Sequence, residues 1–143
     1  MQIRKGVESF LKEMSKLFEL VVFTSAEREY AKCVVKWLDP MGIYIKRIYS
    51  REHCKMVNEY CIKDLRVVCS DLRRVVLLDN SVVSFSMQMS NGIHIKSFLG
   101  SDCDGELFTI RKLLSELAKE PDVRSFLEKQ FDMQKLFDLY CGH

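Results

Sequence analysis

The stretch Phe18–Leu38, FELVVFTSAEREYAKCVVKWL, is the most informative about the fold class because it contains a complete change from strand to helix. Its first six residues, Phe18–Phe23, are mostly apolar, rich in β-branched and aromatic side chains, and typical of a buried strand. From Glu27 to Leu38 the apolar residues recur every three or four positions, which predicts a helix. The polar residues Thr24–Ala26 join the two elements. This junction between a strand and a helix is the repeating unit of α/β proteins.

The same alternation continues on both sides of this stretch. Upstream, the spacing of apolar residues predicts an amphipathic helix over Val7–Leu17. Downstream, Asp39–Gly42 contains the proline and glycine that end the helix. The further predictions, in chain order, are a strand over Ile43–Tyr49, a short helix or irregular loop over Glu59–Val68, a strand over Arg74–Leu78, a brief strand over Ile93–Lys96, a helix over Glu106–Ala118 and a last helix from Val123 onward.

Strands that alternate with helices at these lengths predict a doubly wound α/β fold, with a mainly parallel sheet and helices on both faces. The length of 143 residues suits one domain, so we expect residues 1–143 to form a single domain. Ligands bind such folds at the carboxyl ends of the strands.

Composition and charge exclude several classes of protein. Hydrophobic residues make up 48% of the chain, which indicates a folded protein. The net charge of +2 comes from 22 basic and 20 acidic residues spread along the sequence, so no basic tract predicts nucleic acid as a partner. No apolar run is long enough for a membrane span, and the first residues do not resemble a signal peptide. We therefore expect an intracellular protein of the nucleus or cytoplasm.

The six cysteines are widely spaced, without a CxxC pair or a zinc-type cluster. Together with the expected intracellular location, this spacing predicts reduced and mostly buried thiols.

Polar residues follow the predicted strands where a binding site is expected: Thr24 and Ser25 after the first strand, Lys63 in the middle segment, and Asp79 and Asn80 after the apolar strand. A hydroxyl and free backbone N–H groups can bind phosphate, a lysine can neutralise its charge, and carboxylate or amide oxygens suit Mg²⁺. Each group could also be purely structural, as a helix cap, a solvated lysine and a turn after a strand. As a set, they favour phosphoryl transfer.

Several ordered blocks of the sequence are similar to one known family. The chain resembles the small C-terminal-domain phosphatases, the Dullard-like phosphatases and the nuclear LIM-interactor-interacting factors over roughly Ile3–Phe126. The blocks that carry the resemblance are IRKGVESFLKEM (Ile3–Met14), VVFTSAEREYA (Val21–Ala31), LDPMGIYIKRIYS (Leu38–Ser50), REHC (Arg51–Cys54), KDL (Lys63–Leu65) and DLRRVVLLDNS (Asp71–Ser81).

The resemblance implies a fold and a chemistry. The family belongs to the haloacid dehalogenase superfamily, whose members dephosphorylate through an aspartyl-phosphate with Mg²⁺. Its usual substrates are phosphoserine and phosphothreonine in proteins, among them the C-terminal domain of RNA polymerase II. The matching positions assign phosphate binding to Thr24, Ser25 and Lys63, a Mg²⁺ ligand to Asn80 with Asp79 beside it, and the substrate entrance to Tyr30 and Arg51.

The family's nucleophile and general acid lie in a DxDxT motif upstream of the block that begins here at Ile3, and this chain has no such motif there. Asp102 and Asp104 have the DxD spacing, but they lie after Asp79 and Asn80 in the sequence and are followed by a glycine. They are therefore a weak match to the motif. We therefore expect an N-terminally incomplete phosphatase domain that lacks its first strand and is inactive by itself. The missing motif is also consistent with a gene model that starts too late or with a true pseudophosphatase.

Three functions follow from these observations. The first is a protein serine/threonine phosphatase that needs its missing strand. The second is a module that binds phosphopeptides or a scaffold without cleaving them. The third, the weakest, is a structural protein similar to the family's import-subunit relatives.

Overall fold

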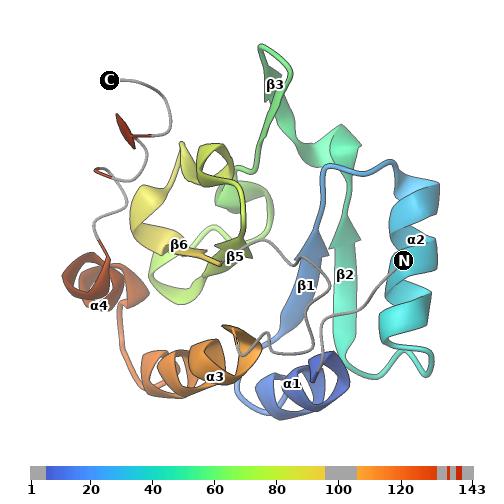
Figure 1. The fold of residues 1–143 in the computed structure, drawn as a ribbon, viewed down its shortest axis with the longest axis horizontal. Helices are drawn as coiled ribbons and strands as arrows, with labels where there is room; N and C mark the ends of the chain where they lie inside the picture. The colour runs from blue at the N-terminus through green and yellow to red at the C-terminus, as the bar shows by residue number, and fades with distance from the viewer. Residues whose placement is uncertain (1–5, 96–105, 132–134, 136–137, 140–143) are drawn as a thin grey trace. The chain divides into compact units, whose positions relative to one another are not determined.

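The computed structural model describes residues 6–95, 106–131, 135 and 138–139. The chain divides into two compact units, Met1–Glu52 with Ser97–Lys119 and His53–Lys96 with Glu120–His143. Each unit contains its own pair of parallel strands (Figure 1).

The first unit is built around strands β1 (Leu20–Phe23) and β2 (Ile45–Tyr49). The two strands are parallel, and Phe23 pairs with Tyr49 at their carboxyl ends. Helix α2 (Arg28–Leu38) connects them and runs alongside β2 in Figure 1. This unit is therefore the βαβ arrangement that the sequence predicts.

Two further helices, α1 (Val7–Met14) and α3 (Glu106–Leu117), complete the first unit and lie side by side. An ion pair of 2.8 Å joins Arg111 of α3 to Glu13 of α1. The buried residues of α3 recur at helical spacing, as an amphipathic helix requires: Ile110, Leu114 and Leu117.

The second unit contains the antiparallel hairpin of β3 (Lys55–Val57) and β4 (Tyr60–Ile62), and the parallel pair of β5 (Leu77–Asp79) and β6 (Gly92–His94). Short 3₁₀ helices connect these strands. They are η2 (Leu65–Val67), η3 (Leu72–Arg74), η4 (Val82–Phe85) and η5 (Met89–Asn91). A further 3₁₀ helix, η1 (Arg51–His53), precedes the hairpin and begins in the first unit. Helix α4 (Val123–Gln130) packs against η3 and η5.

The core of the second unit forms around Leu65, Leu77 and Phe85. Gly92 on β6 allows the Phe85 ring to pack closely, because a Cβ atom at this position would lie 2.4 Å from the ring. The side chain of Asn91 is also buried and donates hydrogen bonds to the carbonyls of Leu72 and Val75, at 2.6 and 2.8 Å.

The structure corrects several predictions made from the sequence. In the segment predicted as a strand over Arg74–Leu78, strand β5 begins only at Leu77. Arg74 instead belongs to a 3₁₀ turn, which starts where the Asp71 side chain accepts the N–H of Arg73. The segment Glu59–Val68 contains strand β4 as well as a 3₁₀ helix. Among the described residues, the strands form three separate two-stranded sheets.

The cysteine prediction was also wrong in part. The structure joins Cys54 and Cys61 in a disulfide, and Cys33 is exposed on α2. Within the described part of the chain, no helix has the length and apolar character needed to cross a bilayer.

Candidate functional site

Lys63 lies directly after β4, and its side chain is buried. Its ammonium group forms an ion pair with the carboxylate of Asp79, and both side chains are at most 10% exposed. The backbone N–H of Lys63 donates to the carbonyl of Ser84 at 3.2 Å. A buried lysine needs a partner of opposite charge, and Asp79 is that partner.

Asp79 is the last residue of β5, so its side chain stands at the carboxyl end of a parallel strand. One carboxylate oxygen faces Lys63, and the other accepts the backbone N–H of Ser81 at 2.8 Å. These two contacts hold the carboxylate in place and orient the residues that follow it. A hydrogen bond between neighbouring residues therefore forms the turn after β5. Lys63, 16 positions away, neutralises the charge of the Asp79 carboxylate.

Asn80 follows Asp79 and is exposed. The backbone carbonyl oxygen of Asn80 lies 3.1 Å from Nε2 of His94 on the neighbouring strand β6. A carbonyl only accepts hydrogen bonds, so this contact needs a proton on Nε2. His94 therefore supports the backbone of the Asn80 turn, a role that sequence reasoning missed because the two residues meet only through strand pairing.

Gln88 is a second residue that sequence reasoning missed. Its side-chain carbonyl accepts the N–H of Leu65 at 2.9 Å, and its amide donates to Asp64 at 2.7 Å. Asp64 also pairs with Arg66, whose guanidinium holds the pKa of Asp64 well below its usual range. These contacts hold the segment that begins with Lys63. No periodic pattern connects residues 24 positions apart, so only the fold reveals them.

The first unit contains the other predicted phosphate-binding residues. Thr24 follows β1, and its hydroxyl oxygen accepts the N–H of Ala26 at 3.1 Å, while its own N–H donates to the carbonyl of Tyr49 at 2.9 Å. Ser25 is exposed in the same turn. Thr24 thus shapes the turn between the strand and α2, and Ser25 is accessible to solvent.

The two residues predicted at the substrate entrance are both exposed in the first unit. Arg51 donates from Nε to the carbonyl of Ser25 at 2.8 Å and lies 3.8 Å from the carboxylate of Glu27. Tyr30 lies in the first turn of α2. The structure therefore brings Arg51 to the turn that carries Thr24 and Ser25.

The donors at this site suit Mg²⁺ in type. An exposed amide and a neighbouring carboxylate are oxygen ligands, which Mg²⁺ prefers. Asn80 is exposed whereas Asp79 is buried, so Asn80 is the better placed of the two to reach a cation. Within the described residues, no group of three or more His, Cys, Asp or Glu side chains could hold a metal ion. These residues would therefore supply only part of a magnesium site.

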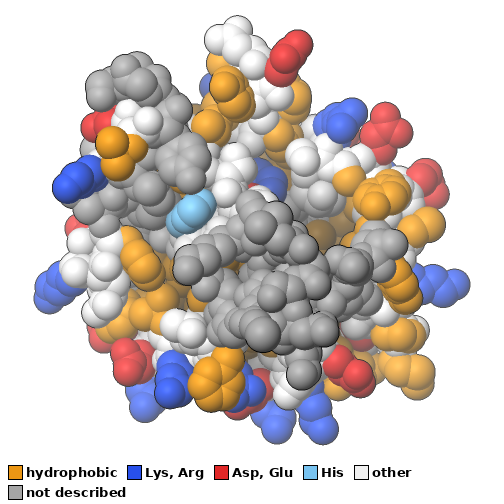
Figure 2. Space-filling model, in the orientation of Figure 1, with side chains coloured by type: hydrophobic (Ala, Val, Ile, Leu, Met, Phe, Trp, Pro, Cys, Tyr) orange, Lys and Arg blue, Asp and Glu red, His pale blue; other side chains and the backbone are white. Residues whose placement is uncertain are grey.

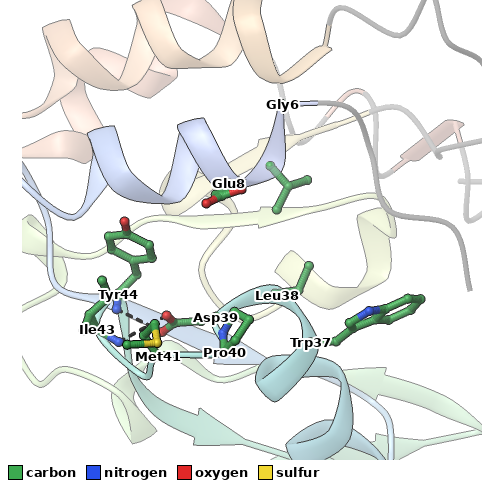
Figure 3. Close-up of a pocket in the computed structure, with 10 residues that line it drawn as sticks. Gly6, Glu8, Trp37, Leu38, Asp39, Pro40, Met41, Ile43 and Tyr44 are labelled. Atoms are coloured by element: carbon green, nitrogen blue, oxygen red, sulfur yellow. Dashed lines mark hydrogen bonds between the residues drawn. The ribbon is translucent and has the colours of Figure 1, made fainter.

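A surface pocket of about 430 Å³ lies elsewhere in the first unit, between the start of α1 and the loop after α2 (Figure 3). Buried Asp39 organises this loop by accepting the N–H groups of Ile43, Tyr44 and Ile45 at 2.9 to 3.1 Å. Burial alone would raise the pKa of Asp39, but these three hydrogen bonds outweigh it and hold the pKa below 3.8. The pocket is lined by loop and helix residues and not by Thr24, Tyr30 or Arg51.

The face drawn in Figure 2 carries basic and acidic side chains that are intermingled. Neither sign dominates on this face, which agrees with the balanced composition of the sequence.

The chain matches the family model described as NLI interacting factor-like phosphatase over residues 1–124. The chain belongs to this phosphatase family. The resemblance read from the sequence blocks is therefore confirmed.

Curated members of the NLI interacting factor-like phosphatase family are similar to most of this chain. It is 37% identical to CTD nuclear envelope phosphatase 1B of Danio rerio, over 94% of the chain and 55% of that protein. It is 35% identical to the human carboxy-terminal domain RNA polymerase II polypeptide A small phosphatase 1, over 88% of the chain and 48% of that protein. The chain thus spans about half the length of these relatives.

A solved structure of Fcp1, an essential RNA polymerase II CTD phosphatase, is also similar. The TM-score is 0.60 at 29% identity, and the match covers 90% of this chain and 36% of that one. The expected α/β fold class, with parallel strands and helices, is confirmed. The weak DxD match at Asp102 and Asp104 lies outside the described residues.

Proposed function

We propose that this chain provides the phosphate-binding part of a Mg²⁺-dependent protein serine/threonine phosphatase that works through an aspartyl-phosphate. The observation that carries the proposal is the buried Lys63, paired with Asp79 at the carboxyl end of β5 and followed by exposed Asn80. Membership of the NLI interacting factor-like phosphatase family supports it.

Lys63 would bind phosphate through its ammonium group. A lysine held in place by a buried carboxylate loses little conformational freedom when a phosphate arrives, so it is preorganised for a dianionic group. Asp79 would position Lys63, and the hydrogen bond from Ser81 keeps that carboxylate oriented. Thr24 and Ser25, which follow β1 in the first unit, are also proposed to bind phosphate, on the basis of their matching positions in the family.

Asn80, with Asp79 beside it, would hold Mg²⁺. When bound, the ion would neutralise charge on the transferring phosphoryl group. The 143 residues contain no DxDxT motif, so they do not supply the nucleophilic aspartate of the proposed reaction. We therefore expect no turnover by the chain alone.

The proposed substrate is a protein phosphorylated on serine or threonine. The names of the human relative and of Fcp1 point to the C-terminal domain of RNA polymerase II as one candidate. Tyr30 and Arg51, exposed near the start of α2, would contact the protein around the phosphorylated residue. The nucleus or cytoplasm is the proposed location.

The test is hydrolysis of p-nitrophenyl phosphate and of a phosphoserine peptide, with and without Mg²⁺. The chain alone is compared with a version extended upstream, in its own genomic sequence, to include a DxDxT segment. Activity of the extended version that needs Mg²⁺ supports the proposal. Inactivity of both versions, with phosphopeptide binding retained, would favour a binding module instead.

Site variants sharpen this test. In the active version, Lys63→Met should lower kcat by about 100-fold or more, since a charged group facing the phosphate is lost. The matched control is Lys55→Met, because Lys55 is an exposed lysine of the hairpin that directly precedes Lys63. Circular dichroism must show that both variants are folded. Near-normal turnover by a folded Lys63→Met variant contradicts the role of Lys63.

A further inference from the structure

The hairpin β3–β4 is held weakly by packing. All three residues of β3 are exposed, and its tip places Asn58 and Glu59 in the left-handed region, with φ of 49° and 71°. That conformation suits asparagine but is unfavourable for glutamate. A two-stranded hairpin is marginally stable without help from other elements. Something besides side-chain burial must therefore keep this hairpin closed.

One side of the hairpin is anchored to the unit that contains it. The hydroxyl of Ser84 on η4 donates to the backbone carbonyl of Cys61 at 3.5 Å. The backbone carbonyl of Ser84 accepts the N–H of Lys63 at 3.2 Å. Strand β4 is therefore attached on both sides of Ile62. Among the described strands, β3 pairs only with β4.

The disulfide between Cys54 and Cys61 connects the free side of the hairpin to the anchored side. The two Cα atoms are 5.6 Å apart, a separation that suits a disulfide, and the residues are seven positions apart. Both cysteines are only partly buried, so a small thiol or disulfide can reach them. By contrast, Cys33 and Cys69 are free thiols in this structure.

We propose that Cys54 and Cys61 are a reversible redox modification site that controls the order of the β3–β4 hairpin. The nucleus and the cytoplasm, the locations proposed above, are reducing, and protein disulfides there are mostly transient or regulatory. The partial exposure of this pair and its place at the base of a weakly packed hairpin fit that behaviour.

The reaction is thiol–disulfide exchange with a small-molecule disulfide such as oxidised glutathione. One cysteine thiolate attacks the small disulfide, forms a mixed disulfide and releases one thiolate. The second cysteine thiolate attacks the protein sulfur of the mixed disulfide, which forms the Cys54–Cys61 bond and releases the second thiolate. The two protons lost by the cysteines go to the two released molecules. The cysteines are oxidised and the small disulfide is reduced.

The Cys54–Cys61 disulfide can affect the proposed phosphate site because Cys61 lies two residues before Lys63. Reduction leaves β4 on η4 but frees β3, and the contacts around Cys61 and Lys63 then lose the support of a closed hairpin. That consequence for Lys63 as a phosphate ligand rests on the proposed function. The redox site itself does not, since it concerns only the two cysteines and the hairpin.

The test equilibrates the chain in glutathione buffers of graded redox poise, blocks free thiols with a maleimide and maps the cysteines by peptide mass spectrometry. We expect a Cys54–Cys61 linked peptide whose fraction rises with the oxidised share of glutathione and returns to zero after dithiothreitol. Hydrogen exchange should slow over residues 55–62 in the oxidised form. The Cys54→Ser/Cys61→Ser variant should lose both responses, and the control Cys33→Ser/Cys69→Ser should keep them.

Three outcomes would overturn the redox site: alkylation of both cysteines at every poise, a bond that native-state dithiothreitol cannot reduce, or linkage of either cysteine to another partner. If hydrogen exchange over residues 55–62 is the same in both redox forms, the disulfide does not control the order of the hairpin. None of these readouts requires phosphatase activity. A phosphatase assay that fails while the linked peptide forms reversibly therefore counts against the proposed function and not against the redox site.

Discussion

Breaking the buried pair of Lys63 and Asp79 should destabilise the chain far more than removing both charges. Lys63→Met leaves the Asp79 carboxylate 7% exposed and without its cation. Removing one partner of a buried pair typically costs about 3–5 kcal/mol. Asp79 keeps its hydrogen bond from Ser81, so we expect the lower end, about 3 kcal/mol.

The double variant Lys63→Met/Asp79→Asn restores neutrality while an asparagine oxygen can still accept the N–H of Ser81. Asp79→Asn alone leaves Lys63 buried without its anion and should also cost about 3 kcal/mol. We expect the double variant to lose only about 1–2 kcal/mol, so the coupling energy in the double-mutant cycle should be about 4–5 kcal/mol. Urea unfolding followed by far-ultraviolet circular dichroism measures these values, with m checked for constancy. Circular dichroism is preferred because Trp37, the one tryptophan of the chain, lies on α2 in the other unit.

The exposed Lys55→Met variant is the control and should change the free energy of unfolding by less than about 0.5 kcal/mol. The reasoning is refuted if Lys63→Met is as stable as this control. It is equally refuted if the effects of the Lys63 and Asp79 substitutions simply add, because the two side chains would then not interact.

Three further predictions use the same urea assay. Gly92→Ala should cost about 1–3 kcal/mol, because its methyl group would lie 2.4 Å from the Phe85 ring. The double variant Gly92→Ala/Phe85→Leu should lose less stability than the sum of the two single variants, and additive losses would contradict the clash. Asn91→Asp should cost about 3 kcal/mol, because it cannot donate to the two backbone carbonyls that Asn91 reaches at 2.6 and 2.8 Å; a loss below about 1 kcal/mol would show those bonds to be unimportant. The pKa of Asp39 is lower in the folded chain than the ordinary 3.8, so its contribution to stability is present above that pH and lost as the pH falls below it. Asp39→Asn should therefore show a shallower loss of stability between pH 5 and pH 3, and an identical slope would contradict this account.

Several parts of the fold follow from short-range sequence patterns. Helix α2 was expected over Glu27–Leu38 and occupies Arg28–Leu38, because its apolar residues repeat at helical spacing. Strand β1 was expected over Phe18–Phe23 and occupies Leu20–Phe23. The strand expected over Arg74–Leu78 was less accurate, since Arg74 belongs to a 3₁₀ helix that follows Asp71 and strand β5 begins only at Leu77.

The hairpin escaped prediction for a different reason. Its strands have three residues each and are mostly exposed, so they lack the alternation of buried and exposed side chains that indicates a strand. The turn also lacks glycine, the usual sign of a tight hairpin, and uses Asn58 and Glu59 with positive φ instead. The disulfide was missed with it, because spacing alone does not show which cysteines are close.

The α/β class, the family and the candidate residues Lys63, Asp79 and Asn80 could all be read from the sequence, because they depend on local periodicity and on short ordered blocks. Which of these side chains meet became known only from the folded chain. Folding paired Lys63 with Asp79, placed His94 against the Asn80 turn and joined Cys54 to Cys61. The physical reason is that ion pairs, strand registers and disulfides depend on the distances between segments, and the folded backbone sets those distances.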